Sequence, residues 1–153
     1  VYGKFLVSYA AKRHYTVGSG ESEGWLIDDY WNESGSPKRT HVSLNHHTAE
    51  AAFLYRLADA TGDESYAQTA EKMVKGIENT AAKWIMPDGN LYYSYGNNGR
   101  MITGDYPYLT YNDLLELQRL WTKRHGTANE AVSKLMASKL AWMNKNGITG
   151  YNK

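Results

Sequence analysis

The sequence predicts an all-α fold of stacked antiparallel helical hairpins, a segment of an (α/α) toroid with a short extended or β link between hairpins. Residues 43–86 have the pattern of two amphipathic helices separated by a Gly62-Asp63 break. A second hairpin of similar build occupies residues 110–147. Because each hairpin leaves an apolar face uncovered, neighbouring hairpins must stack, and we expect residues 1–153 to form a single domain.

The first hairpin has the clearest helical periodicity. Gly62 is expected to end its first helix, and Asp63 to cap the second. On the first helix one face is expected to hold Ala49, Ala52, Phe53, Leu57 and Ala60. The second helix has apolar residues at helical spacing along its whole length, namely Tyr66, Ala70, Met73, Val74, Ile77, Ala81, Trp84 and Ile85.

Residues 88–108 link the two hairpins. Within the link, Leu91 to Tyr95 alternates loosely and is expected to form a short strand or an extended segment. Asn97-Asn98-Gly99 is a turn signal.

Glycine and helix-capping residues predict the boundaries of the remaining helices and loops. Lys4 to Tyr15 is expected to be a helix, and residues 17–40 a long loop rich in Gly and Ser. Gly126 is expected to end the first helix of the second hairpin. Thr127 and Glu130 have the spacing of a capping box for its last helix.

The composition is that of a folded protein, with 42% hydrophobic and 22% charged residues. The 17 basic and 16 acidic residues nearly cancel, so neither nucleic acid nor a membrane is an expected partner. The absence of cysteine excludes a disulfide framework and thiolate metal sites. A start at Val1 without a leader indicates a processed or excised piece of a longer protein, which we expect to be extracytoplasmic or secreted.

Aromatic residues point towards carbohydrate. There are 13 tyrosines and 5 tryptophans but only 2 phenylalanines, and rings with a polar edge suit stacking on sugars. Seven residues of the link are aromatic or charged candidates: Tyr92, Tyr93, Tyr95, Arg100, Asp105, Tyr106 and Tyr108. A tyrosine acts in acid-base catalysis when its pKa is lowered, which the charge of Arg100 would favour. Arginine also binds a sugar carboxylate through two hydrogen bonds. Alternatively, these tyrosines pack the junction between hairpins.

Three histidines, His41, His46 and His47, invite comparison with a metal site. Adjacent helical residues point roughly 100° apart, so His46 and His47 do not readily share an ion. We therefore expect neither a metal nor a cofactor.

An acidic segment precedes the first hairpin. Asp28, Asp29 and Glu33 lie among the aromatic residues Trp25, Tyr30 and Trp31. A carboxylate pair performs acid-base chemistry at a glycosidic bond, so this arrangement is compatible with a glycoside hydrolase. The alternative is an acidic loop over an aromatic cluster.

A series of short motifs runs from Gly24 to Gly126. They are Gly24-Trp25, Asp29-Tyr30-Trp31, Leu44-Asn45 with His47, Leu54-Tyr55, Thr61-Gly62-Asp63, Asp105-Tyr106 and Asp113-Leu114. Together they resemble the C-terminal helical domain of the D-glucuronyl carbon-5 epimerase family. Three positions depart from the family pattern. His46 stands where the family has glycine, and Pro107 and Thr110 stand where the family has histidines.

The resemblance implies a toroid of helical hairpins that acts on a uronic-acid polysaccharide without a cofactor. It implies that tyrosines remove the proton next to the sugar carboxylate and return it from the other face. Tyr106 matches the family motif directly, and Tyr95 or Tyr93 matches the preceding tyrosine. The expected substrate-binding residues are Arg100, Trp25, Asp29, Tyr30, Trp31, Asn45, His47, Asp105 and Tyr108.

Three functions stay open at the level of sequence. The first is epimerase-like proton abstraction at carbon 5 of glucuronate. The second is a glycoside hydrolase or lyase that uses the carboxylates of residues 28–33, and the third is a non-catalytic glycan-binding module. The expected partner is a polysaccharide or oligosaccharide containing uronic acid, with self-association through the open ends of the toroid.

Overall fold

The computed structural model describes residues 1–30 and 39–153, and its fold is mixed α/β. The prediction of an all-α toroid segment is therefore wrong. The described residues form five α-helices and two small antiparallel sheets and are 59% helical. In chain order the elements are α1 (Tyr2–Lys12), β1 (His14–Val17), the 3-10 turn η1 (Gly20–Ser22), β2 (Gly24–Ile27), β3 (Val42–Ser43), α2 (Leu44–Thr61), α3 (Glu64–Trp84), β4 (Tyr92–Tyr95), β5 (Met101–Gly104), α4 (Leu109–His125) and α5 (Glu130–Lys145).

The first sheet lies where a helix end and a loop were expected. Helix α1 stops at Lys12, and β1 pairs with β2 in antiparallel register from His14 opposite Ile27 to Val17 opposite Gly24. The run Tyr15-Thr16-Val17 is aromatic and β-branched, which favours a strand. Four residues are too few for periodicity to reveal a strand in the sequence.

The second sheet has the order β3-β4-β5. Val42 lies opposite Tyr95, and Tyr92 lies opposite Gly104. The prediction that Leu91 to Tyr95 is extended is confirmed by β4, whereas β5 was not predicted. This sheet brings the segment before α2 against the link between the two pairs of helices.

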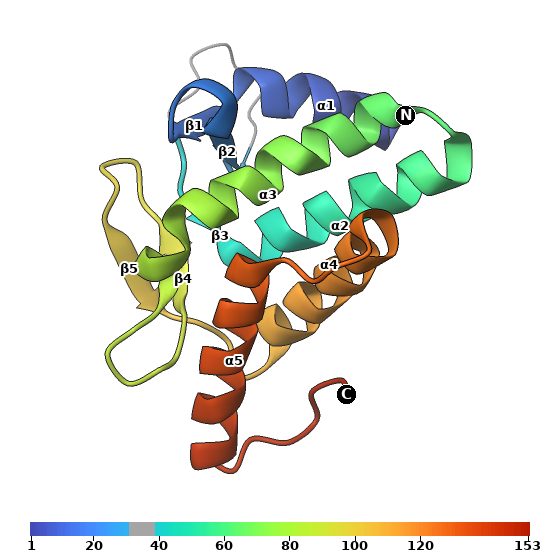
Figure 1. The fold of residues 1–153 in the computed structure, drawn as a ribbon. Coiled ribbons are helices and arrows are strands. Elements are labelled where there is room, and N and C mark those ends of the chain that lie inside the picture. Colours follow the sequence, from blue (N-terminus) through green and yellow to red (C-terminus); the bar gives the residue numbers. More distant parts are fainter. Residues whose placement is uncertain (31–38) are drawn as a thin grey trace.

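Helices α2 and α3 lie side by side at the centre of the molecule (Figure 1). The apolar stripe predicted for α3 is largely confirmed, and Asp63 caps this helix by accepting a hydrogen bond from Ser65 N at 3.0 Å. The face predicted for α2 is partly confirmed, because Ala52 is buried and Phe53 and Leu57 pack against the core. Ala60 is exposed, and the buried side also includes Leu54 and Ala58. Helix α2 is covered by α3 and by α4, so two of its sides are buried.

Two glycines allow β2 to approach α3 directly. A Cβ on Gly24 would collide with the backbone of Gly76, and a Cβ on Gly76 would collide with the carbonyl of Trp25. Glycine in the interior of a helix lowers the stability of the helix. The close contact with β2 explains why α3 nevertheless has glycine at position 76. This contact fixes β2, and with it the segment that leads to Asp28 and Asp29.

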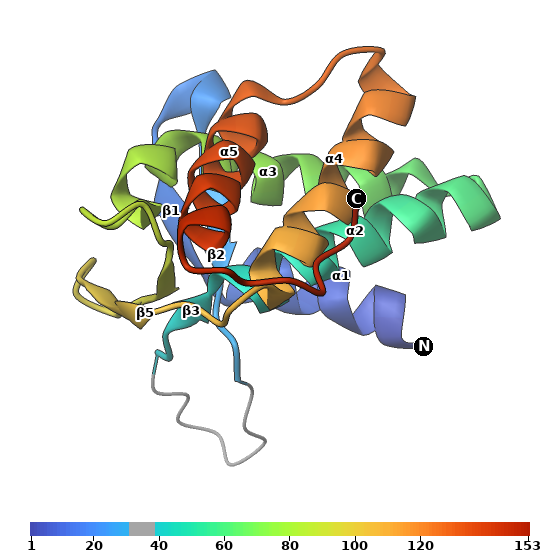
Figure 2. The same cartoon turned by 90° about the horizontal axis from the view of Figure 1, so that it is seen from below.

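Helices α4 and α5 form a second pair that packs against α2 and α3 (Figure 2). Gly126 ends α4 in the left-handed conformation, as predicted, with φ of 78°. The predicted capping box is wrong: Asn129 caps α5 by accepting a hydrogen bond from Val132 N at 3.0 Å. None of the helices in the described ranges has both the length and the apolar character needed to cross a membrane.

Candidate functional site

Strands β4 and β5 bring two tyrosines together. Because Tyr92 pairs with Gly104, the residues that follow β5 run back beside β4. The rings of Tyr93 and Tyr106 therefore meet edge to face, with centroids 5.5 Å apart and planes at 89°. Tyr106 is 48% exposed, so this pair is open to a ligand.

An open pocket of about 470 Å³ adjoins the tyrosine pair. Its lining residues are Tyr93, Thr103, Gly104, Asp105, Tyr106 and Pro107. A shallow pocket with aromatic walls and hydroxyl groups is suited to a sugar ring, whose faces are apolar and whose edges are polar. We call it the tyrosine pocket.

Beside the tyrosines, Asp29 holds a cluster of polar side chains. Its carboxylate is buried and accepts hydrogen bonds from Ser43 N at 2.7 Å and from Ser43 Oγ at 2.6 Å. Nε2 of His41 and Nδ1 of His46 each lie 3.3 Å from its Oδ2. The His46 side chain is 50% exposed, and that of His41 is 32% exposed. A buried, hydrogen-bonded carboxylate therefore lies next to two partly exposed histidines, and the Nε2 atom of His41 is itself buried beside it.

His41 joins the Asp29 cluster to the tyrosine pair. Its ring centroid lies 5.9 Å from that of Tyr93 and 5.6 Å from that of Tyr30. Four rings, those of Tyr30, His41, Tyr93 and Tyr106, therefore form a continuous row. Imidazole changes its charge between pH 5 and 8, so this row combines stacking surface with a group that can transfer protons.

A buried ion pair includes Asp105, one of the residues that line the tyrosine pocket. Nζ of Lys139, on α5, lies 2.9 Å from Oδ2 of Asp105 and donates to Asn90 Oδ1 at 2.7 Å and to the Tyr106 carbonyl at 2.6 Å. Thr110 Oγ1 donates to Oδ1 of Asp105 at 2.5 Å. Lys139 is fully buried. Burial lowers the pKa of Lys139, and Asp105 opposes that shift.

Burial shifts the pKa values of Tyr93 and Asp113. Burial raises the pKa of Tyr93, against a hydrogen bond with Ser43 that lowers it. Burial, with the nearby charge of Asp105, raises the pKa of Asp113 on α4 to about 6, and His46 acts in the opposite direction. At neutral pH, Tyr93 therefore carries its proton, while Asp113 titrates close to neutrality.

Two of the expected residues lie in the core. Tyr95 is 9% exposed, and its ring packs against Tyr15 at 5.6 Å and Trp84 at 6.4 Å. His47 is buried with Nε2 3.0 Å from the Met73 carbonyl, while its Nδ1 accepts from Ile27 N at 3.3 Å. Burial lowers the pKa of His47 to about 4, so it is a neutral tie between α2, α3 and β2.

Other expected residues lie apart from the tyrosine pocket. Trp25 stacks on His14 at 4.3 Å, and Tyr108 begins α4. Asn45 is 6% exposed in the first turn of α2. Arg100 lies near the tip of the β4–β5 hairpin. Trp31 and Glu33 lie outside the described residues.

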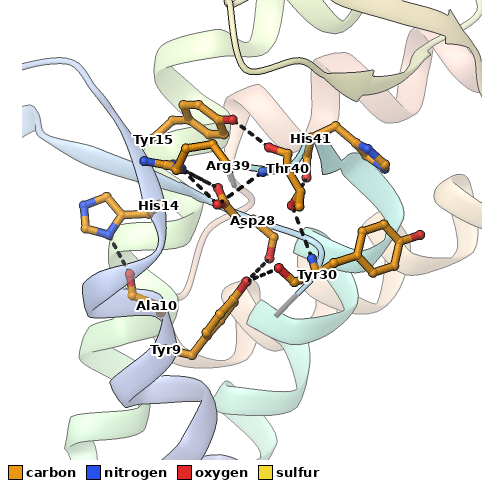
Figure 3. A network of polar contacts seen from close by, with 9 residues as sticks. All are labelled: Tyr9, Ala10, His14, Tyr15, Asp28, Tyr30, Arg39, Thr40 and His41. Atoms are coloured by element: carbon orange, nitrogen blue, oxygen red, sulfur yellow. Dashed lines mark hydrogen bonds and ion pairs between the residues drawn. The ribbon is translucent and has the colours of Figure 1, made fainter. Parts of the chain in front are cut away.

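Asp28, adjacent to Asp29, belongs to a network of polar contacts that Thr40 joins to the backbone of Tyr30 and His41 (Figure 3). Arg39 donates to both oxygens of Asp28, and its guanidinium lies 4.0 Å above the ring of Tyr15. Tyr9 Oη donates to the carbonyls of Asp28 and Tyr30 at 3.1 and 3.0 Å. These contacts tie together the two ends of the segment between Tyr30 and Arg39.

Comparison with known proteins does not assign this chain to a family. No family model matches this chain, and no curated protein sequence matches it. Within the described ranges, no three His, Cys, Asp or Glu side chains are grouped so that they could hold a metal ion. The function is therefore argued from the tyrosine pocket and the Asp29 cluster.

The sequence singled out Tyr93, Tyr106, Asp29 and Tyr30, and the structure brings these four residues together. It also adds His41, His46 and Asp113, none of which was among the predicted site residues. His41 directly precedes Val42-Ser43, the residues that form β3. The sequence did not reveal that β3 pairs with β4, so it gave no reason to place His41 near Tyr93.

Proposed function

We propose that this chain is a carbohydrate-active domain that binds uronic-acid polysaccharide and exchanges the proton at carbon 5 of glucuronate. The observation that carries the proposal is the row of rings from Tyr30 through His41 and Tyr93 to Tyr106 beside an open pocket. Tyr93 and Tyr106 line the pocket and supply stacking surface and hydroxyl groups, and the imidazole of His41 contacts the Tyr93 ring. The resemblance to glucuronyl epimerases supports the same substrate.

The proposed step is a proton transfer without cleavage of the sugar chain. A base takes the hydrogen of carbon 5 as a proton, and the electron pair of that bond moves into the carboxylate. A proton returned to the opposite face of carbon 5 gives the epimer. We assign the base to the imidazole of His41, which Asp29 orients, and the donor to the hydroxyl of Tyr93 or Tyr106.

Deuterium incorporation tests this proposal directly. Polysaccharides containing glucuronate are incubated with the protein in heavy water, and NMR measures deuterium at carbon 5. We expect exchange in the natural protein and at least a hundredfold loss in the double variant Tyr93→Phe, Tyr106→Phe, because general acid-base catalysis contributes about 10²–10⁴-fold. Tyr151→Phe, a tyrosine near the C-terminus that contacts Asn144, is the matched control. Equal exchange in the double variant would refute the assignment.

A lyase is the second candidate, because it removes the same proton before breaking the bond at carbon 4. Ultraviolet absorbance of the unsaturated product would identify it. The contacts of Asp28 and Asp29 argue against a hydrolase that uses this pair. Asp28 is held by Arg39, and Asp29 by Ser43.

A non-catalytic glycan-binding module is the third candidate. The raised pKa of Tyr93 favours it, because no charge activates this tyrosine as a base. Glycan binding with no deuterium exchange and no new chain ends would establish this reading.

A further inference from the structure

A second hollow adjoins the tyrosine pocket along β5. It has a volume of about 390 Å³ and is lined by Asn97, Asn98, Arg100, Met101, Ile102 and Thr103. Thr103 lines both hollows, so the two lie next to each other along the strand. We call the second hollow the arginine pocket.

Thr103 has an unusual backbone at the junction of the two pockets. Its φ is 49°, and it is the one non-glycine residue in the described ranges with a positive φ. This conformation is unfavourable for a β-branched residue and persists where the surrounding structure enforces it. Strain therefore coincides with the point where the two hollows meet.

Arg100 carries an uncompensated charge in the arginine pocket. Among the described arginines, Arg39, Arg56 and Arg124 form ion pairs, and Arg119 donates to a backbone carbonyl. The guanidinium of Arg100 is exposed and has no partner among the described residues. In the tyrosine pocket, by contrast, Asp105 forms an ion pair with Lys139. The surface along β5 is thus positive at one end.

Arg100 lies just before β5, and Tyr106 lies two residues after it. Three residues separate Arg100 from Gly104, and an antiparallel strand rises by about 3.4 Å per residue, so their Cα atoms are up to about 14 Å apart. A ligand that contacts Arg100 and the tyrosine pair therefore spans several sugar units.

We propose that the two pockets form one groove for an extended acidic oligosaccharide, in which Arg100 binds the acidic group of a sugar unit other than the one at Tyr93 and Tyr106. The planar guanidinium suits a carboxylate or a sulfate, and Asn97 and Asn98 line the same hollow for hydroxyl groups. The inference rests on the proposed function for its substrate class. It goes beyond that function by making binding depend on chain length and on Arg100.

Calorimetric titration with oligosaccharides of defined length tests the groove. The probes are an unsulfated disaccharide, tetrasaccharide and hexasaccharide of alternating glucuronate and N-acetylglucosamine, and a sulfated hexasaccharide. We expect the hexasaccharide to bind at least tenfold more tightly than the disaccharide. Arg100→Gln removes most of that gain, whereas Arg56→Gln, an exposed arginine on α2, preserves it. A larger effect of the variant on the sulfated probe identifies sulfate as the group bound by Arg100.

The outcomes separate the groove from the chemistry. Length-dependent binding that Arg100→Gln abolishes, without deuterium exchange, supports the groove and overturns the proposed reaction. Deuterium exchange with equal affinity for all lengths overturns the groove alone. Equal gains in Arg100→Gln and Arg56→Gln also overturn it, as does failure of all four probes to bind.

Discussion

Asp28 and Asp29 are adjacent in the chain but differ in their neighbours. Asp28 pairs with an arginine, whereas Asp29 lies next to two partly exposed histidines. Asp28 is enclosed by Arg39, whose ring contact with Tyr15 completes a network that ties loop ends together. Asp29 is equally buried, yet two of its neighbours, His41 and His46, reach the surface. A closed network supports the fold, whereas a buried carboxylate next to partly exposed histidines is available for chemistry. The comparison predicts that closed contacts affect stability and that the Asp29 cluster affects ligand binding.

The largest effect is expected at Lys139, the most enclosed charge. Lys139→Met leaves Asp105 buried without its partner and should lower the free energy of unfolding by about 4 kcal/mol. Urea denaturation measures this loss. Lys139→Met combined with Asp105→Asn should recover at least half of the loss, because no buried charge is left, and Lys134→Met on the exposed face of α5 should change little. A small effect of Lys139→Met alone would show that the pair is not enclosed.

Low pH should destabilise the protein through His47, which is buried and neutral. Its folded pKa of about 4 lies below the value near 6.5 of an unfolded chain, so protons favour the unfolded state. The stability contributed by neutral His47 is complete above pH 6.5 and is lost as pH falls towards 4, by about 3 kcal/mol in all. Unfolding of the His47→Gln variant across this range should depend less on pH than that of the natural protein. His125→Gln, which changes an exposed histidine, should keep the slope.

The two aspartates themselves give the most direct comparison. Asp28→Asn should lower the free energy of unfolding by about 2 kcal/mol, less than for a fully buried pair because Arg39 is partly exposed. Asp29→Asn should cost about 1 kcal/mol but weaken glycan binding severalfold more than Asp28→Asn does. Denaturation and calorimetric titration of both variants would measure this contrast. The opposite order of effects would remove the distinction between the two regions.

The smallest effect is expected at Asp113. Its folded pKa of about 6 exceeds the unfolded value near 3.9, so the folded state binds this proton more tightly. Stability from the protonated form is complete below pH 3.9 and is lost as pH rises through 6. Asp113→Asn should therefore stabilise the protein at pH 7 by about 1 kcal/mol, since partial exposure screens the charge, and should have no effect at pH 4. Equal gains at both pH values would contradict the shift.

Local patterns were the part of this fold that could be predicted. The stripe of α3, its cap at Asp63 and the end of α4 at Gly126 depend on residues within a turn or two, so spacing reveals them. Strands β1, β2 and β5 have four residues each and are stabilised by hydrogen bonds to a partner strand, which the periodicity of four residues does not reveal. For that reason the all-α prediction failed at those strands and not at the helices.

The sequence by itself determined the helices of the two pairs, the turns between them and the concentration of tyrosines in the link. Tertiary structure alone decided which polar residues work together. It placed Tyr95 in the core and Tyr93 at the surface, enclosed Lys139 and set Arg100 in a pocket of its own. The physical reason is that helix propensity and capping act between near neighbours. Burial, ion pairing and pKa shifts depend instead on groups brought together from far apart in the chain.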